Sequence, residues 1–310
     1  MDFLGGVTGG LLHGKKRRTM GSHQIPERLE ICKGTPVYGK GYAPLSKYRH
    51  KTASLILFLL LAYAGLWVLF GIGRWLAIPF AMDPGVPGGQ FFLIGAAWPS
   101  ISAFLAILIH EKRRGLGVLL RRALAWRFSP FWYLAALLIP LAVNAVNSVV
   151  AVVLMGATAP ADWFVPAFGP GFLIFFLLFN GFGEEIGWRG LALPVLQRHF
   201  GSAGGNLVLG GLWALWHLPL FWLKGSYQYG NSILLFVLLL TAWSMIIGLL
   251  VNRCRGSILP AILFHESANA IAFNLRYPGS MMGYGVWILA AGLAVIWMPK
   301  PWLRWPGQPD

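Results

Sequence analysis

The chain has 310 residues, of which 57% are hydrophobic and 11% are charged, and its formal net charge is +15. Soluble domains carry roughly a quarter charged residues, so this composition excludes an ordinary water-soluble domain. The positive charge lies in short blocks beside apolar stretches. It therefore favours orientation in a membrane over nucleic-acid binding, and we expect no nucleic-acid partner.

The first 52 residues are polar and basic, with little apolar periodicity. We expect them to form a loosely ordered cytoplasmic tail. The apolar stretch that follows is too long for the hydrophobic part of a signal peptide, so no cleavable signal is expected. The two cysteines, Cys32 and Cys254, lack metal or redox spacing, which argues against a disulfide framework and a zinc knuckle.

Eight apolar stretches of about 20 residues follow the tail, and each is long enough to cross a hydrocarbon core of roughly 30 Å. The predicted spans are 53–72, 90–110, 131–155, 170–191, 203–223, 232–251, 257–275 and 283–299. This pattern predicts an all-α polytopic membrane protein. Its transmembrane helical domain covers 53–299, and a short cytoplasmic tail covers 300–310. Residues 115–127, between the second and third spans, suit either an amphipathic helix on an anionic surface or a basic loop with a short helical turn.

Topology follows from the Lys and Arg residues. With a cytoplasmic N-terminus, 21 of the 25 fall in segments on the cytoplasmic side and three on the opposite side, while Arg189 lies within a span. This asymmetry fits the positive-inside rule. We expect an integral membrane protein, in the plasma membrane, with both termini cytoplasmic.

Ionisable and polar residues inside spans are costly, and each is a candidate functional residue. They are concentrated in three spans. The fourth span contains Glu184, Glu185 and Arg189, the fifth contains His217, and the seventh contains His265, Glu266 and Asn269. One cytoplasm-facing cavity could reach the whole set, because helix geometry places it in or near the cytoplasmic leaflet.

Helical spacing divides the charged residues of the fourth span into a pair and a separate carboxylate. Glu185 and Arg189 are four residues apart, so they share a face and can form a buried pair. Glu184 points about 100° away and is the freer carboxylate. All three could instead form an ion cluster that holds helices together.

The same spacing places His265 and Asn269 on one face of the seventh span. Imidazole and carboxamide can both donate hydrogen bonds to a developing oxyanion. An interhelical polar clamp is the structural alternative. Glu266 faces elsewhere and is expected to pair with a neighbouring cation.

Three motifs lie in this region. Glu184 to Arg189 reads E-E-x-x-x-R, His265 to Asn269 reads H-x-x-x-N, and Trp213 to His217 resembles F-x-x-x-H with Trp in place of Phe. In this order, each inside an apolar span, they resemble the CPBP family of intramembrane proteases. That family includes CAAX prenyl endopeptidases and bacteriocin-processing or immunity-type proteins. The resemblance covers about 165–275.

The resemblance implies roles for the candidate residues. Glu184 and His217 would activate a water molecule, and His265 and Asn269 would stabilise the tetrahedral oxyanion. Glu185 and Arg189 would support the site. The Trp at position 213 is expected to be a packing change with little effect on the chemistry. The partners would be a peptide or protein substrate, with or without a prenyl group, and membrane lipids.

The favoured mechanism needs no cofactor, although zinc held by Glu184, His217 and His265 is an alternative. The H-E-x-x-H pattern of zinc proteases is absent, because His265-Glu266 is followed by Asn269, and Asn is a poor zinc ligand. No G-x-S-x-G motif or Cys–His pair indicates a protein nucleophile.

Two other function classes compete with a protease. One is a non-catalytic membrane immunity or interaction protein of the same fold, in which the polar residues serve as clamps. The other is a transporter that uses the carboxylates and histidines as a proton relay. The sequence lacks the duplicated half expected of many transporters.

Overall fold

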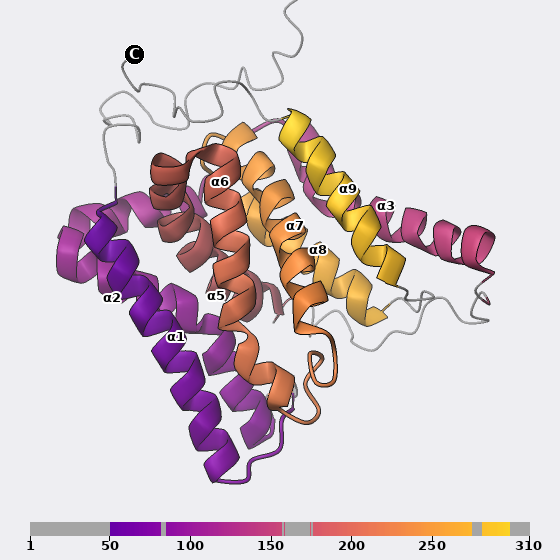
Figure 1. Cartoon of the computed structure of the whole chain (residues 1–310). Helices are drawn as coiled ribbons and strands as arrows, with labels where there is room; N and C mark the ends of the chain where they lie inside the picture. The colour runs from indigo at the N-terminus through magenta and orange to yellow at the C-terminus, as the bar shows by residue number, and fades with distance from the viewer. Residues whose placement is uncertain are drawn as a thin grey trace, which may run out of the picture. The chain divides into compact units, whose positions relative to one another are not determined.

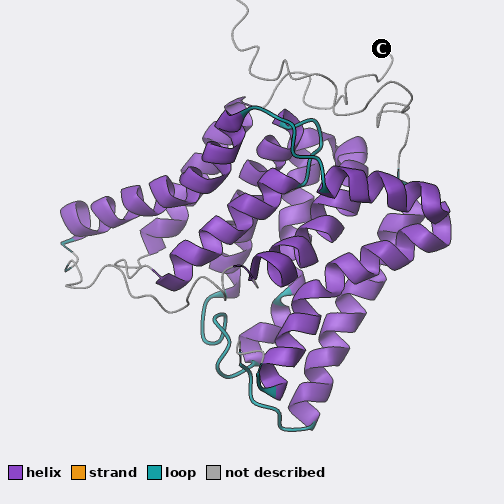
Figure 2. Cartoon of the chain, turned by 180° about the vertical axis from the view of Figure 1, so that it is seen from behind, coloured by secondary structure: helices purple, strands orange, loops and turns teal. Residues whose placement is uncertain are grey.

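The computed structural model describes residues 50–81, 85–156, 158, 174, 176–274 and 281–297. Throughout these ranges the regular structure is helical, with no strand, which confirms the predicted all-α class (Figures 1 and 2). The two predicted terminal tails lie almost wholly outside the described residues.

Four helices are long and apolar enough to cross a membrane, by length and composition, among the described residues. They are α1 (Thr52–Trp75), α2 (Pro87–Ala123), α3 (Pro130–Met155) and α7 (Ile233–Arg253). They coincide with the first, second, third and sixth predicted spans. Their outward-facing surfaces are rich in exposed large apolar side chains, such as Leu60 at 64% exposure, as expected of helices that face lipid.

The fourth and fifth predicted spans form one nearly continuous helical run. It comprises η2 (Leu177–Gly181), α5 (Phe182–Glu185), η3 (Ile186–Ala192), α6 (Leu193–Trp216) and the 3₁₀ turn η4 (Leu218–Trp222).

A backbone break divides this run. Gly201 has a φ of +78°, which divides α6 into two helices at the place where the sequence predicted a loop. The first of these helices continues to residue 200, beyond the predicted end at 191.

The seventh and eighth predicted spans correspond to α8 (Leu259–Asn274) and α9 (Met281–Trp297). The helices α8 and α9, with 16 and 17 residues, are shorter than the helices that count as spans by length and composition. The run through α6 is not among those helices either. The total of eight spans therefore stays a prediction.

Helix α2 extends through most of the basic segment 115–127, so the helical interpretation is confirmed as far as Ala123. Lys112 adopts a φ of +57° and breaks the helix just before this part. Arg122 is buried and donates hydrogen bonds to the carbonyls of Arg189, Gly190 and Gly256. The buried face of this helix thus contacts η3 and the turn before α8. The sequence had suggested that an amphipathic helix here would lie on a lipid surface.

Tight packing against α2 brings the glutamate-bearing segment into the interior. A Cβ atom at Gly187 would lie 2.5 Å from the carbonyl oxygen of Pro99, and one at Gly183 would lie 2.7 Å from that of Ala96. Only glycine allows this approach, a device that is common between membrane helices. Elsewhere α1 packs on α2, α6 on α7, and α9 on both α3 and α7 (Figure 1).

Candidate active site

The two adjacent glutamates lie on the single turn α5, between two π-helical stretches, η2 and η3. A π-helical turn contains an extra residue and changes the direction of the side chains that follow. Such turns occur frequently at functional sites. Because α5 also packs against α2, Glu184 and Glu185 are both buried, at 3% and 0% exposure.

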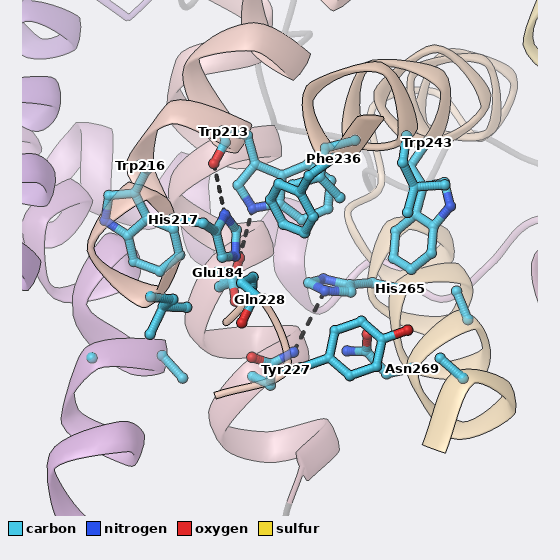
Figure 3. Close-up of a pocket in the computed structure, with 18 of the residues that line it drawn as sticks. Glu184, Trp213, Trp216, His217, Tyr227, Gln228, Phe236, Trp243, His265 and Asn269 are labelled. Atoms are coloured by element: carbon cyan, nitrogen blue, oxygen red, sulfur yellow. Dashed lines mark hydrogen bonds between the residues drawn. The ribbon is translucent and has the colours of Figure 1, made fainter. Parts of the chain in front are cut away.

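A cavity of about 150 Å³ lies at this point (Figure 3). Glu184, His217, His265 and Asn269 all line it, so the structure brings together the four residues predicted to be catalytic. They come from α5, from the residue that directly follows α6, and from α8. The remaining lining is mostly apolar and aromatic and includes Leu66, Phe70, Phe80, Phe92, Phe176, Trp216, Leu220, Phe236, Trp243 and Trp287.

Glu184 accepts a hydrogen bond of 2.7 Å from the indole Nε1 of Trp213. It lies outside the Glu185–Arg189 hydrogen bond, as the sequence predicted for the freer carboxylate. The interpretation of Trp213 as a packing residue was wrong, because its N–H bonds directly to the predicted catalytic carboxylate. Phenylalanine at this position has no N–H to donate.

His217 has a defined orientation. Its Nδ1 lies 2.8 Å from the main-chain carbonyl oxygen of Trp213, one turn earlier in α6. A carbonyl can only accept, so Nδ1 carries a proton, and in the neutral imidazole Nε2 is then left with a free lone pair. His217 therefore presents a hydrogen-bond acceptor at Nε2.

Glu185 forms the predicted ion pair with Arg189, at 2.8 Å between Oε1 and the guanidinium, with both side chains fully buried. The same Oε1 lies 2.9 Å from Nδ1 of His265. Sequence analysis missed this second contact, which joins α5 to α8. The guanidinium of Arg189 also lies 4.1 Å from the ring centroid of Trp213, in a cation–π arrangement.

Asn180, in η2, is a site residue that sequence analysis did not identify. It is buried, lines the cavity, and directs its amide towards His265 Nε2 at 3.4 Å and Glu266 Oε1 at 3.3 Å. Glu266, which was expected to pair with a cation, thus accepts a hydrogen bond from the neutral amide of Asn180. The available signal was a polar residue one helical turn before Glu184 in an otherwise apolar stretch.

Zinc ligation requires three or four side chains with suitable geometry. Among the described residues, no group of three or more His, Cys, Asp or Glu side chains could hold a metal ion. Glu184, His217 and His265 line one cavity without forming such a group. The metal-free mechanism stays a prediction that chemical analysis must test.

Comparisons with known proteins support the motif assignment. Residues 166–271 match the model of a family described as type II CAAX prenyl endopeptidase Rce1-like. The resemblance to CAAX endopeptidases is confirmed over this segment. The CAAX prenyl protease 2 of Methanococcus maripaludis is 33% identical over 136 residues, which cover 41% of this chain and 50% of the relative. The chain thus spans about half the length of this CAAX protease.

Proposed function

We propose that this protein is an intramembrane endopeptidase of the CAAX protease type, which hydrolyses a peptide bond with an activated water molecule. The supporting observation is the convergence of Glu184, His217, His265 and Asn269 on one cavity, from three separate segments of the chain. The family match covers all four residues. The reaction needs no nucleophilic side chain, since water attacks the carbonyl carbon directly.

In the first step, Glu184 and His217 activate the water. Nε2 of His217 has a free lone pair because Nδ1 donates to the carbonyl of Trp213. The carboxylate of Glu184 accepts a hydrogen bond from the Trp213 indole on one oxygen and keeps acceptor capacity for water. One proton leaves the water as its oxygen bonds to the substrate carbon, and the general base takes it.

The carbonyl oxygen of the substrate then becomes an oxyanion that His265 and Asn269 stabilise. The amide of Asn269 donates directly. Nδ1 of His265 already donates to Glu185, and Nε2 faces the amide of Asn180 at 3.4 Å. His265 therefore donates to the oxyanion only when Nε2 takes up a second proton and the substrate oxygen replaces Asn180 as its partner. The nearby carboxylate of Glu185 favours that cationic form electrostatically, and a cationic donor stabilises an oxyanion more strongly than a neutral one.

Collapse of the tetrahedral intermediate completes the reaction. The carbon–nitrogen bond breaks, and the proton first taken from water passes to the departing amine. The products are a carboxylic acid and an amine, and Glu184 and His217 return to their starting states.

We propose a peptide with a lipid-modified C-terminal region as the first substrate class to test. The relative from Methanococcus is named CAAX prenyl protease 2. The largely aromatic and aliphatic wall of the cavity suits a hydrocarbon group or an apolar peptide segment. We further propose that both termini lie in the cytoplasm and that the substrate enters from that side.

A peptide-library assay with purified protein in detergent tests this function. Prenylated and plain versions of each sequence are incubated with the protein, and mass spectrometry identifies the products. We expect internal peptide-bond cleavage, with prenylated peptides preferred by at least about tenfold in kcat/KM, which corresponds to about 1.4 kcal/mol. Failure to cleave any peptide in a folded, lipid-reconstituted sample would contradict the proposal.

A further inference from the structure

Trp213 contacts four residues of the site. Its indole N–H donates to Glu184 at 2.7 Å, and its main-chain carbonyl accepts from His217 Nδ1 at 2.8 Å. Its ring lies 4.1 Å beneath the guanidinium of Arg189 and meets the ring of His265 edge to face, with 5.1 Å between centroids. One buried residue of α6 thus contacts both members of the proposed water-activating pair (Figure 3).

The hydrogen bond to Glu184 has no substitute nearby. Among the described residues, the Trp213 indole is the only hydrogen-bond partner of the Glu184 side chain. A buried carboxylate is costly to ionise, and a donor to the charged form offsets part of that cost. Without the indole N–H, the protonated carboxyl group, which cannot accept a proton from water, becomes more populated.

The hydrogen bond to Glu184 can be distinguished from the packing contacts of the Trp213 ring. Phenylalanine, which the family motif has at this position, would keep an aromatic face for Arg189 and His265 but would lose the N–H. The main-chain carbonyl that orients His217 would also remain, because any residue supplies it. The bond to Glu184 is therefore the feature that tryptophan adds to the site.

We propose that Trp213 is a positioning residue whose indole N–H holds the carboxylate of Glu184 ionised and directed into the cavity. This inference rests on the proposed function for its catalytic meaning, but the bond itself can be tested without any substrate.

Infrared titration of the purified protein measures the protonation of Glu184. The C=O stretch of protonated carboxyl groups is followed against pH, and the Glu184 band is assigned by its loss in Glu184→Gln. We expect Trp213→Phe to raise the pH at which this group titrates by about one unit, because a hydrogen bond to a charged group contributes about that much.

Trp216→Phe is the matched control. Trp216 lies three residues further along α6, lines the same cavity, and stacks edge to face on His217 with 4.7 Å between centroids. Its indole N–H donates to the carbonyl of Ala62 instead of Glu184. Loss of this N–H should leave the titration of Glu184 within about 0.3 units of the wild type, since no bond to the carboxylate is removed.

A second replacement protects the test against misfolding of the phenylalanine variant. Incorporation of benzothienyl-alanine at position 213 replaces the indole N–H with sulfur and preserves the shape of the ring. A similar upward shift in this protein supports the proposal. Titration of Glu184 at the wild-type pH in both replacements would overturn it.

Cleavage kinetics provide the functional part of the test. In Trp213→Phe, the acidic limb of the kcat profile should move upward by the same amount, with KM within about twofold, because the bond affects the base rather than substrate binding. An infrared shift without cleavage in any variant would contradict the proposed function alone. Cleavage with an unshifted infrared titration would contradict only the role of Trp213.

Discussion

Glu185 and His265 are joined by a hydrogen bond of 2.9 Å between the carboxylate Oε1 and the imidazole Nδ1. The same oxygen pairs with Arg189, so one carboxylate connects an ion pair in the glutamate-bearing segment to the H-x-x-x-N motif of α8. Glu185 therefore does more than neutralise a buried cation. It fixes which nitrogen of His265 points towards the cavity.

Changes at Glu185 should affect folding and chemistry separately. Glu185→Ala leaves Arg189 buried without its partner, which costs about 3–5 kcal/mol, so we expect a low folded yield. Glu185→Gln keeps the shape and an acceptor oxygen but removes the charge that favours cationic His265. Its kcat should fall about 10- to 100-fold in the fraction that folds.

Thermal unfolding in detergent and cleavage kinetics distinguish these two effects. Glu266→Gln is the comparison, because it also removes a carboxylate charge near His265 but leaves the ion pair of Glu185 with Arg189 intact. A Glu185→Gln protein with wild-type kcat would show that the bond to His265 has no part in the reaction.

The contact between Gly187 and α2 should be intolerant of any side chain. A Cβ in Gly187→Ala would lie 2.5 Å from the Pro99 carbonyl oxygen and 2.9 Å from the ring of Phe58. Backbone atoms would have to move apart, so we expect destabilisation of about 1–3 kcal/mol.

Gly211→Ala provides the matched comparison for this prediction. A Cβ there would meet nothing within 4 Å, and alanine is the better helix former by about 1 kcal/mol. The melting temperature should therefore fall for Gly187→Ala and stay the same or rise for Gly211→Ala. Equal melting temperatures would show that α5 and η3 do not pack this tightly on α2.

Metal removal should leave activity intact. The metal-free mechanism depends only on side chains, so dialysis against a strong zinc chelator should not change kcat by more than about twofold. Metal content of the purified protein is measured in parallel. If the chelator abolishes activity and added zinc restores it, Glu184, His217 and His265 would instead be assigned as zinc ligands.

The sequence predicted the class of fold and pointed to polar residues that converge on one cavity, because both features leave local signals. A charge inside an apolar stretch is conspicuous, and spacing of four residues places Glu185 beside Arg189 on any helix. The hydrogen bond from Trp213 to Glu184 left no such signal, because it joins residues 29 positions apart on different helices.

Backbone irregularities explain the other differences. The π-helical turns around Glu184 and the positive φ angles at Lys112 and Gly201 depend on tertiary packing, which apolar periodicity does not report. Asn180 was overlooked because an uncharged amide in an apolar stretch stands out less than an ionisable group does.

The carboxylate of Glu184 is the centre of the proposed reaction, and Glu184→Gln tests it most directly. The amide keeps the size of the side chain and an oxygen that can accept from Trp213, so the variant should fold with a melting temperature close to the wild type. It cannot take a proton from water. Cleavage of the best library peptide, measured side by side for both purified proteins, should fall by at least about 100-fold in kcat. Equal rates for wild type and Glu184→Gln would contradict the mechanism.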